Sequence, residues 1–584
     1  MPKTQTTKEK KWVLRPQVSE KELAKYPEMH PYLVQVLHNR NIKDQAEIDY
    51  FINPDYGRDV LDPFGFSSME KTTDRIIKAI GQKEKIVVYG DYDADGVTAA
   101  VIMMELLIAL GAKPTVYLPY RQTEGYGLNE KAIKELHDKK TDLIITVDCG
   151  TTNLGEIELA NKLGMTVIII DHHQKPAKLP PAYAIINSSF EDEPYPFRSL
   201  TAGGLAFKVA SALLSKTKYG KKVGLKKPLP EGWEKWFLDL VAISTVADMA
   251  PLLGENRVLV AYGLTVLKKT RRLGLQKLYD TMKIDPETTN TSTISWQIGP
   301  RLNAAGRMDH ASAAYQLLIT NTAEEAAQIA EDLEKTNRTR QQLTDKMVKA
   351  GIEQIGEVGD RKILFAFDKT WQIGVVGLVA GKIMDRYHLP VIAMGMSGQD
   401  VIGSGRSVPI FNIVENLQMV DKYLDKYGGH PQACGFTLKY SKDRSAFMKA
   451  LSEQAEQALS GMDTRPLLEI DAQIELTQVN WSLVEELAKL EPFGQGNHRP
   501  LFVATGLEIK EIQTVGKEDK HLRLMVCHNS KVIFKTIGFS FGSWSRRVRI
   551  GEKVDMVFEI DINEWNGKRE IQLKTVDIKL SDND

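Results

Sequence analysis

The chain has 584 residues, of which 42% are hydrophobic and 26% are charged, as in an ordinary globular protein. Its 76 basic and 76 acidic residues cancel, so binding to a polyanion would require a local basic patch. No apolar run reaches the roughly 18 residues that a membrane span requires, and the N-terminus lacks the apolar stretch of a secretory signal, so we expect no membrane association. Three widely separated cysteines, Cys149, Cys434 and Cys527, fit neither a disulfide framework nor a zinc spacing and predict a cytoplasmic protein.

The length predicts about three or four domains, and the first pattern along the chain is an N-terminal helical lead at residues 1–70. Residues 71–325 alternate hydrophobic strands with helical stretches. This alternation predicts an α/β domain with a doubly wound, mostly parallel sheet. The predicted strands are 86–89, 115–118, 142–147 and 166–170, and the predicted helices between them are 97–110, 128–137 and 155–163.

A helical pattern without Gly or Pro follows, and we assign residues 326–350 to a connecting helix. Its apolar stripe becomes polar at Asn337, Arg340 and Thr344, which suits a helix that crosses an open gap between two domains. Whether this polar part faces substrate or only solvent stays open. A second α/β domain is predicted at 351–460.

Residues 465–584 differ in character, because short strand patterns replace helices. They predict a small β-barrel of the OB type, a common module for binding single strands, with a β-sandwich as the alternative. Asn566-Gly567 is a strong hairpin signal within this segment. The predicted strands are 502–512, 521–526, 532–539, 553–562 and 570–577.

Four acidic or histidine clusters occur in a fixed order, and three of them come where a hydrophobic strand ends. Ligands of open α/β sheets collect outside the carboxyl ends of the strands. Several carboxylates gathered there would repel one another unless cations held them. Oxygen donors with an imidazole suit two Mn²⁺ or Mg²⁺ ions better than a closed zinc site, so we predict a two-metal hydrolase. The expected metal ligands are Asp91, Asp93, Asp95, Asp148, His172 and Asp248, and the expected catalytic residues are Asp93, Asp95, Asp148, His172, His173 and Asp248.

Individual roles follow from chemistry and position. We expect Asp148 to bridge two ions, Asp171 to orient a ligand, and His173 to meet a phosphate or the leaving oxygen. Asp248 would end a helix, an unfavourable place for a negative charge unless it binds a cation. Asp93-x-Asp95-Gly96 also occurs in haloacid-dehalogenase-type phosphatases, in which one Asp attacks phosphorus, but those enzymes have no use for a later Asp-His-His.

The succession Asp91-x-Asp93-Ala94-Asp95-Gly96, Asp148-Cys149-Gly150, Asp171-His172-His173 and Val246-Ala247-Asp248 resembles the DHH phosphoesterase superfamily. Residues 428–435, Gly-Gly-His-Pro-Gln-Ala-Cys-Gly, resemble the signature of the DHH-associated domain. Segments 299–307, 403–407 and 491–497 are similar to the RecJ family of bacterial single-strand-specific 5′ exonucleases, and the resemblance runs from about residue 71 to the end. One position departs from the pattern: many DHH proteins have a histidine where this chain has Tyr89. Asp91 is a candidate for the missing ligand, and the sequence does not assign Asp91, Asp93 and Asp95 to individual ions.

The resemblance implies exonuclease action on single-stranded DNA from a 5′ end, in recombination and repair, together with a single-strand-binding protein and a helicase. The residue types agree, since the planar fork of Arg406 suits phosphate oxygens and two glycines before His430 allow an anion to approach closely. The arginines would alternatively pair with acidic neighbours across a domain interface. Trp544, with Arg546, Arg547 and Arg549, is a candidate for stacking on bases. The expected substrate-binding residues are Arg301, Asn303, Arg307, Ser404, Arg406 and His430.

Two other functions remain open. A DHH-type phosphodiesterase of short oligonucleotides or cyclic dinucleotides would use the same metals, but it would not need the C-terminal barrel. A DNA-binding replication factor with a decayed site is the non-enzymatic alternative. It fits less well, because every acidic and histidine position of the later clusters is present.

Overall fold

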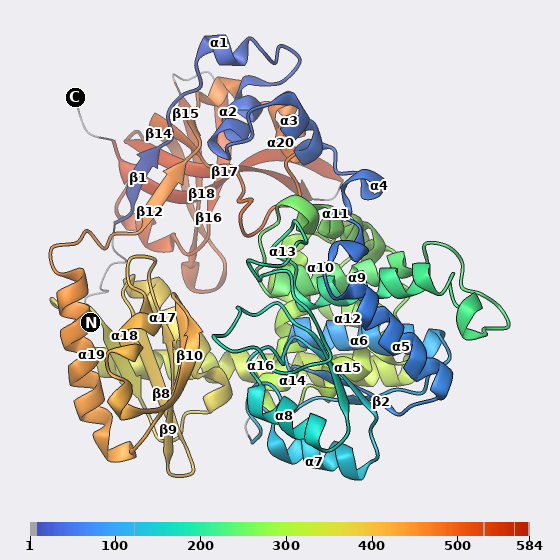
Figure 1. The fold of residues 1–584 in the computed structure, drawn as a ribbon. Coiled ribbons are helices and arrows are strands. Elements are labelled where there is room, and N and C mark those ends of the chain that lie inside the picture. Colours follow the sequence, from blue (N-terminus) through green and yellow to red (C-terminus); the bar gives the residue numbers. More distant parts are fainter. Residues whose placement is uncertain (1–8, 122, 529–531, 566, 582–584) are drawn as a thin grey trace. The chain divides into compact units, whose positions relative to one another are not determined.

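The computed structural model describes residues 9–121, 123–528, 532–565 and 567–581 (Figure 1). These residues form two compact units. The first holds residues 55–464 and 494–496, and the second holds residues 9–54, 465–493 and 497–581. Asn566 of the predicted hairpin turn lies outside the described residues.

The first domain of the first unit is built on a parallel five-stranded sheet, which confirms the predicted doubly wound fold. Its strand order is β3-β2-β4-β5-β6. Strands β2 (Ile86–Gly90) and β4 (Leu143–Val147) are buried throughout, as expected for a parallel sheet covered on both faces. Helices α6 (Ala94–Ala109) and α9 (Ala202–Lys216) pack on one face, and α7 (Glu130–Asp138) and α8 (Leu154–Lys162) pack on the other. The remaining strands are β3 (Thr115–Tyr117), β5 (Thr166–Ile170) and β6 (Ala184–Ile186).

A layer of further helices covers α6 and α9. Helix α10 (Leu238–Ala247) packs against both of them and against α11 (Gly254–Lys268), and α15 (Ser312–Ile319) packs against α6. Helices α12 (Leu273–Met282) and α14 (Gly299–Met308) complete this layer beside α16. The short helical turn η5 (Ile294–Ile298) leads directly into α14.

Helix α16 (Ala323–Ile355) has 33 residues and is therefore about 50 Å long. Ala330 and Leu333 near its start belong to the core around the first sheet, whereas Met347 and Ile355 belong to the core of the next domain. In its middle Asn337 is buried and its Oδ1 accepts hydrogen bonds from Arg340. This confirms the prediction of a long helix that connects two domains and turns polar between them.

The second domain of the first unit has a mixed five-stranded sheet of order β10-β11-β9-β8-β7. Helix α17 (Ile373–Tyr387) covers one face together with the end of α16, and α18 (Ile413–Gln418) and α19 (Arg444–Leu459) cover the other. The strands are β7 (Leu364–Phe367), β8 (Val391–Ser397), β9 (Asp400–Arg406), β10 (Leu424–His430) and β11 (Ala433–Leu438).

The second unit is built on a closed barrel, which confirms the OB prediction and shows that the β-sandwich alternative is wrong. Strands pair in the order β14-β15-β16-β18-β17, and β17 pairs back to β14. Helices α2 (Pro31–Asn39) and α3 (Gln45–Ile52) contribute to the same core as the barrel strands, and β1 (Lys11–Leu14) pairs in parallel with β12 (Leu467–Ile470). The barrel strands are β14 (Phe502–Val515), β15 (His521–His528), β16 (Val532–Gly538), β17 (Lys553–Trp565) and β18 (Lys568–Leu580).

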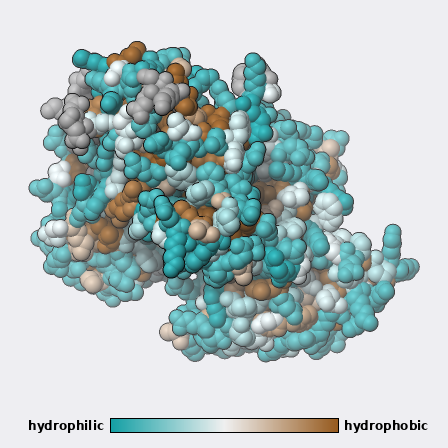
Figure 2. All heavy atoms as spheres, turned by 90° about the horizontal axis from the view of Figure 1, so that it is seen from above, coloured by the Kyte–Doolittle hydropathy of each residue, from teal (hydrophilic) through white to brown (hydrophobic). Residues whose placement is uncertain are grey.

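Among the described residues, no helix combines the length and the apolar character needed to cross a bilayer. On the face shown in Figure 2, hydrophilic residues predominate and hydrophobic ones are scattered between them.

Candidate active site

The sheet of the first domain brings three of the predicted clusters together. Asp91 directly follows β2, Asp148 follows β4, and Asp171 follows β5; all three carboxyl groups are buried. These strands are parallel neighbours, so their carboxyl ends meet at one edge. The first turn of α6 lies close to this edge, because a Cβ at Gly96 would come within 2.7 Å of the Asp91 backbone nitrogen.

His172 lies at the centre of the cluster. Its Nε2 is 3.2 Å from Oδ1 of Asp148, 3.6 Å from Oδ2 of Asp95 and 3.8 Å from Oδ2 of Asp248. Three sets of side chains present ligand atoms within 4.8 Å of one another: Asp148, His172 and His173; Asp95, His172 and Asp248; and Asp91, Asp93 and Asp148. Asp148 and His172 each belong to two sets. The arrangement therefore suits two ions that share ligands.

The Asp95 carboxylate is held firmly from its outer side. It accepts hydrogen bonds from the backbone nitrogens of Ala202 and Gly203, both 2.8 Å away at the N-terminus of α9, and from Oγ of Ser244 on α10 at 2.5 Å. A Cβ at Gly203 would come within 2.5 Å of Oγ of Ser244, so this close approach of α9 to α10 requires glycine. The positive end of α9 thus orients a carboxylate toward His172.

The loop before α6 is fixed in a similar way. Oδ1 of Asp93 caps the helix by accepting from the nitrogens of Asp95 and Gly96, at 2.9 and 3.1 Å. Oδ1 of Asn303 on α14 accepts from the nitrogen of Ala94 at 2.8 Å. Asn303, expected to bind substrate, is therefore placed to hold the acidic loop.

Like charges crowd the site and raise the pKa of its carboxyl groups. Burial, followed by the fields of Asp95, Asp93, Asp91 and Asp248, raises the pKa of Asp148 well above its ordinary value. Burial and the Asp95 and Asp93 carboxylates raise the pKa of Asp248 to about 8. Without counter-ions this arrangement opposes the charged forms, which is the environment that divalent cations would relieve.

The donor atoms present fit such ions. Oδ1 of Asp91 is buried and has no hydrogen-bond partner among the described atoms, which leaves its lone pairs available as a ligand. Carboxylate oxygens and one imidazole are donors that Mn²⁺ and Mg²⁺ accept. Tyr89 takes no part, because its hydroxyl donates to the carbonyl oxygen of Gly127 at 3.0 Å within the core on the other face of the sheet.

His173 stands beside the cluster in a charged pair. Its Nδ1 is 2.7 Å from Oδ1 of Asp171, whose Oδ2 accepts from the backbone nitrogen of Thr151 at 3.0 Å. Burial alone would lower the pKa of His173, but the hydrogen bond and field of Asp171, with the nearby carboxylates, raise it to about 9.

Tyr126, which sequence analysis missed, donates to the carbonyl oxygen of Asp148 at 3.0 Å and lies 3.0 Å from Nδ1 of His173.

A group of arginines faces the acidic loop. Burial, and then the fields of Arg121, Arg340 and Arg406, lower the pKa of Arg307 to about 9, whereas Asp93 acts in the opposite sense. Arg121 also lies over the ring of Tyr92, 4.8 Å from its centroid. Positive charges this close to one another suit an anionic ligand such as phosphate. Sequence analysis did not name Arg121, since its loop has no periodic pattern, and it placed Arg340 only on the polar stripe of the long helix.

The other predicted substrate residues lie on both domains. Nε of Arg301 on α14 pairs with Oε2 of Glu334 on α16 at 2.7 Å, beside Leu333 of the first domain's core. This arginine therefore has an acidic partner, but the pair does not cross a domain interface as the alternative interpretation expected. Nη1 of Arg406 donates to Oγ of Ser404 at 3.1 Å and to the carbonyl oxygen of Gly405 at 2.7 Å. Gly428 to His430 form the exposed end of β10, which is the edge strand of its sheet and pairs with β11, so the close approach of an anion to these glycines stays a prediction. Burial and the fields of His173 and His172 lower the pKa of His430.

Comparison with known proteins shows the family. The model of the N-terminal domain of the DHH family matches residues 85–245, that of the DHHA1 domain matches 360–457, and that of the RecJ OB domain matches 470–577. The single-stranded-DNA-specific exonuclease RecJ of Bacillus subtilis (strain 168) is 35% identical over 565 residues, which cover 96% of this chain and 70% of that protein. The chain belongs to the RecJ family.

Further relatives agree. RecJ of Thermus thermophilus is 32% identical over 506 residues, covering 86% of this chain and 69% of that protein. The crystal structure of T. thermophilus RecJ in complex with Mn²⁺ superposes with a TM-score of 0.83 and 26% identity, covering 98% of this chain and 80% of that one. Membership in the RecJ family excludes the haloacid-dehalogenase-type interpretation of Asp93-x-Asp95-Gly96.

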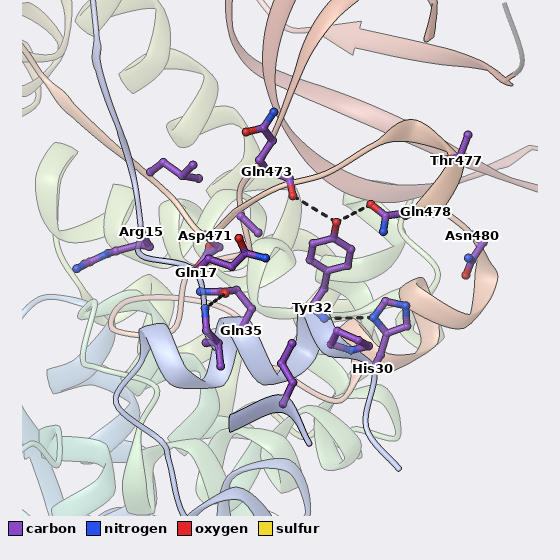
Figure 3. Close-up of a pocket in the computed structure, with 15 residues that line it drawn as sticks. Arg15, Gln17, His30, Tyr32, Gln35, Asp471, Gln473, Thr477, Gln478 and Asn480 are labelled. Atoms are coloured by element: carbon purple, nitrogen blue, oxygen red, sulfur yellow. Dashed lines mark hydrogen bonds between the residues drawn. The ribbon is translucent and has the colours of Figure 1, made fainter. Parts of the chain in front are cut away.

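The second unit contains a cavity of its own (Figure 3). It has a volume of about 560 Å³ and contains none of the predicted site residues. Its polar groups bond mainly with one another: the Tyr32 hydroxyl donates to Oε1 of Gln478 at 2.7 Å, and Oε1 of Gln35 accepts from the nitrogen of Val18 at 2.8 Å. The first of these bonds ties the N-terminal segment to the residues that precede the barrel, and the second lies within the N-terminal segment.

Proposed function

We propose that the chain is a single-strand-specific DNA exonuclease that hydrolyses phosphodiester bonds from the 5′ end with two divalent ions. The observation that carries this proposal is the convergence of five carboxylates and His172 at one sheet edge in a member of the RecJ family. The oligonucleotide and cyclic-dinucleotide alternative is less well supported, since the similarity to named single-stranded-DNA exonucleases extends through the OB barrel.

The residues that would hold the ions are Asp91, Asp93, Asp95, Asp148, His172 and Asp248. Bound Mn²⁺ or Mg²⁺ supplies activated water at neutral pH and stabilises charge on the attacking and leaving oxygens. Asp148 and His172 are the residues shared between candidate ligand sets, so they fix the spacing within the site. Asp171 orients His173 through Nδ1 and leaves the opposite ring nitrogen for the substrate.

The protein also provides charge for the DNA phosphates. His173, with its raised pKa, is protonated at neutral pH and donates to a phosphate oxygen or to the leaving oxygen. Arg307 and Arg406, supported by Arg121, hold the scissile or terminal phosphate. Preorganised donors of this kind stabilise the charge that develops in the transition state.

The OB barrel is proposed to hold single-stranded DNA, as OB folds do with aromatic and basic side chains. Trp544 is a weaker stacking candidate than its sequence context suggested, because it packs partly against the barrel core and Arg547 lies over its ring at 5.4 Å.

A digestion assay tests the proposal. End-labelled single and double strands, each blocked at one end or the other, are incubated with the protein and Mn²⁺. We expect mononucleotide release from the free 5′ end of the single strand only. Asp148→Ala should abolish cleavage while DNA binding and thermal stability are retained. Substantial Mn²⁺-dependent cleavage by that variant would falsify the assignment of the site.

A helicase and a single-strand-binding protein are proposed as partners on the basis of the resemblance alone. A cytoplasmic location is likewise a proposal, in keeping with three buried free cysteines.

A further inference from the structure

Two helices that carry predicted metal ligands run in opposite directions past each other. Asp95 lies in the first turn of α6, and Asp248 caps the C-terminus of α10. The helices pack together, and at this end the 2.5 Å hydrogen bond from Oγ of Ser244 to Oδ1 of Asp95 joins them. Sliding either helix along its axis would therefore change the spacing of the ligands.

The far ends of the same helices meet at one guanidinium. Glu105 on α6 is ten residues beyond Asp95, or about 15 Å along the helix, and Asp239 on α10 is nine residues before Asp248, or about 14 Å. Arg272 donates from Nη1 to Oε1 of Glu105 at 2.6 Å, from Nη2 to Oε2 at 3.0 Å, and from Nε to Oδ2 of Asp239 at 3.1 Å. Its Nη1 also donates to the carbonyl oxygen of Leu318 on α15 at 3.1 Å.

We propose that Arg272 is a positioning residue for the two-ion site: its guanidinium ties the far ends of α6 and α10 and so fixes the separation of Asp95 and Asp248. This inference rests on the proposed function of those two carboxylates as metal ligands. The side chains of Arg272 and Asp239 are only 10% and 3% exposed, so water does not compete strongly for these bonds. The planar fork of arginine can hold two carboxylates at once, whereas a lysine ammonium is a single point charge.

Loss of the Arg272 contacts would weaken metal binding for two reasons. Helices are rigid, so a shift at one end moves the ligand at the other end, and metal ions accept only a narrow range of ligand distances. Ligand distances tolerate only about 0.2 Å of error, and partners of the ligands typically change metal affinity or activity by about 10–100-fold when they are removed. Arg272 does not contact the predicted metal ligands itself and acts on them only through α6 and α10. We therefore expect the lower end of that range.

The chain offers a matched control in the next residue. Arg271 is exposed, and its guanidinium lies over the ring of Trp236 at 3.4 Å. Arg271→Lys makes the same substitution at the next residue and leaves the hydrogen bonds of Arg272 to Glu105 and Asp239 intact. It therefore accounts for any effect of an arginine-to-lysine change in this segment that does not act through the bonds to Glu105 and Asp239.

The test is calorimetric titration of the metal-free, full-length protein with Mn²⁺ alone, alongside thermal unfolding and cleavage at rising Mn²⁺. Arg272→Lys should bind Mn²⁺ about 10-fold more weakly than the wild type, with cleavage recovering at high Mn²⁺, while Arg271→Lys matches the wild type. If Arg272→Lys does not fold, Glu105→Ala decides, since it frees α6 and leaves the Asp239 contact; it should weaken Mn²⁺ binding in the same direction. Wild-type affinity in either folded variant, even with a lowered Tm, overturns the inference. Failure of the wild type itself to bind Mn²⁺ would instead refute the proposed function.

Discussion

Replacing Asp248 with asparagine is expected to stabilise the metal-free protein at pH 8 while it abolishes cleavage. Burial and the neighbouring Asp95 and Asp93 carboxylates raise the pKa of Asp248 from 3.8 to about 8. The folded state then binds more protons than the unfolded state between these two pH values. The free energy of unfolding contributed by Asp248 therefore falls as pH rises from 3.8 to about 8 and stays constant above that.

The size of the effect follows from the shift. A rise in pKa from 3.8 to about 8 corresponds to an upper limit of about 6 kcal/mol. The Asp248 side chain is 31% exposed and shares its proton with neighbours, so we expect only about 1–2 kcal/mol. For a domain of this size that is a rise in Tm of about 2–8 °C.

The Tm of the wild type and of Asp248→Asn is measured by thermal unfolding at pH 5 and pH 8, first in the presence of a chelator and then with Mn²⁺. The variant should melt above the wild type at pH 8, the gap should narrow at pH 5, and Mn²⁺ should stabilise the wild type more. Asp400→Asn, at an exposed position, removes the same charge and serves as control. A lower Tm for Asp248→Asn than for the wild type at pH 8 without metal would refute the reasoning that like charges crowd this site.

Two further predictions concern the substrate side of the site. Asp171→Asn removes the carboxylate that raises the pKa of His173 to about 9. The alkaline limb of the pH–rate profile should therefore move to lower pH. An unchanged limb would show that His173 does not carry the titrating proton. The Asp171–His173 pair adds to the free energy of unfolding below the ordinary histidine pKa, and this contribution disappears as pH rises through about 9. The free energy of unfolding of Asp171→Asn should not show this decrease. Arg406→Gln should weaken binding to single strands of every sequence and reduce the slope of log affinity against log salt by about 0.7, measured by fluorescence anisotropy; an unchanged slope would exclude a phosphate contact.

Local patterns were sufficient to predict the sheet and its acidic edge. Strands β2, β4 and β5 are continuous runs of apolar residues, which is the signature of a parallel sheet buried on both faces. Parallel strands bring their carboxyl ends together by geometry alone. The proximity of Asp91, Asp148 and His172 therefore followed from their positions directly after the strands.

Contacts between distant segments were not accessible in this way. Helices α2 and α3 share a core with the C-terminal barrel, although more than 400 residues of the chain lie between these helices and the barrel strands. The hydrogen bond from Tyr32 to Gln478 is one such contact. Arg121 lies in a loop without periodicity, and only the fold places it near Arg307 and Arg406. The strand pairing of Gly428 to His430 was missed because glycines weaken a strand pattern.

The two charge clusters make sense only together with what binds between them. Burial and mutual repulsion raise the pKa of Asp148 and Asp248 on one side, and burial and repulsion lower the pKa of Arg307 on the other. Core packing gains nothing from either arrangement, since each disfavours the charged form of its own groups. Divalent ions would neutralise the first cluster, and a phosphate group of the proposed substrate would neutralise the second. The electrostatic cost of holding these like charges together is therefore an argument for the ligand that relieves it, and it predicts that ions and DNA bind cooperatively.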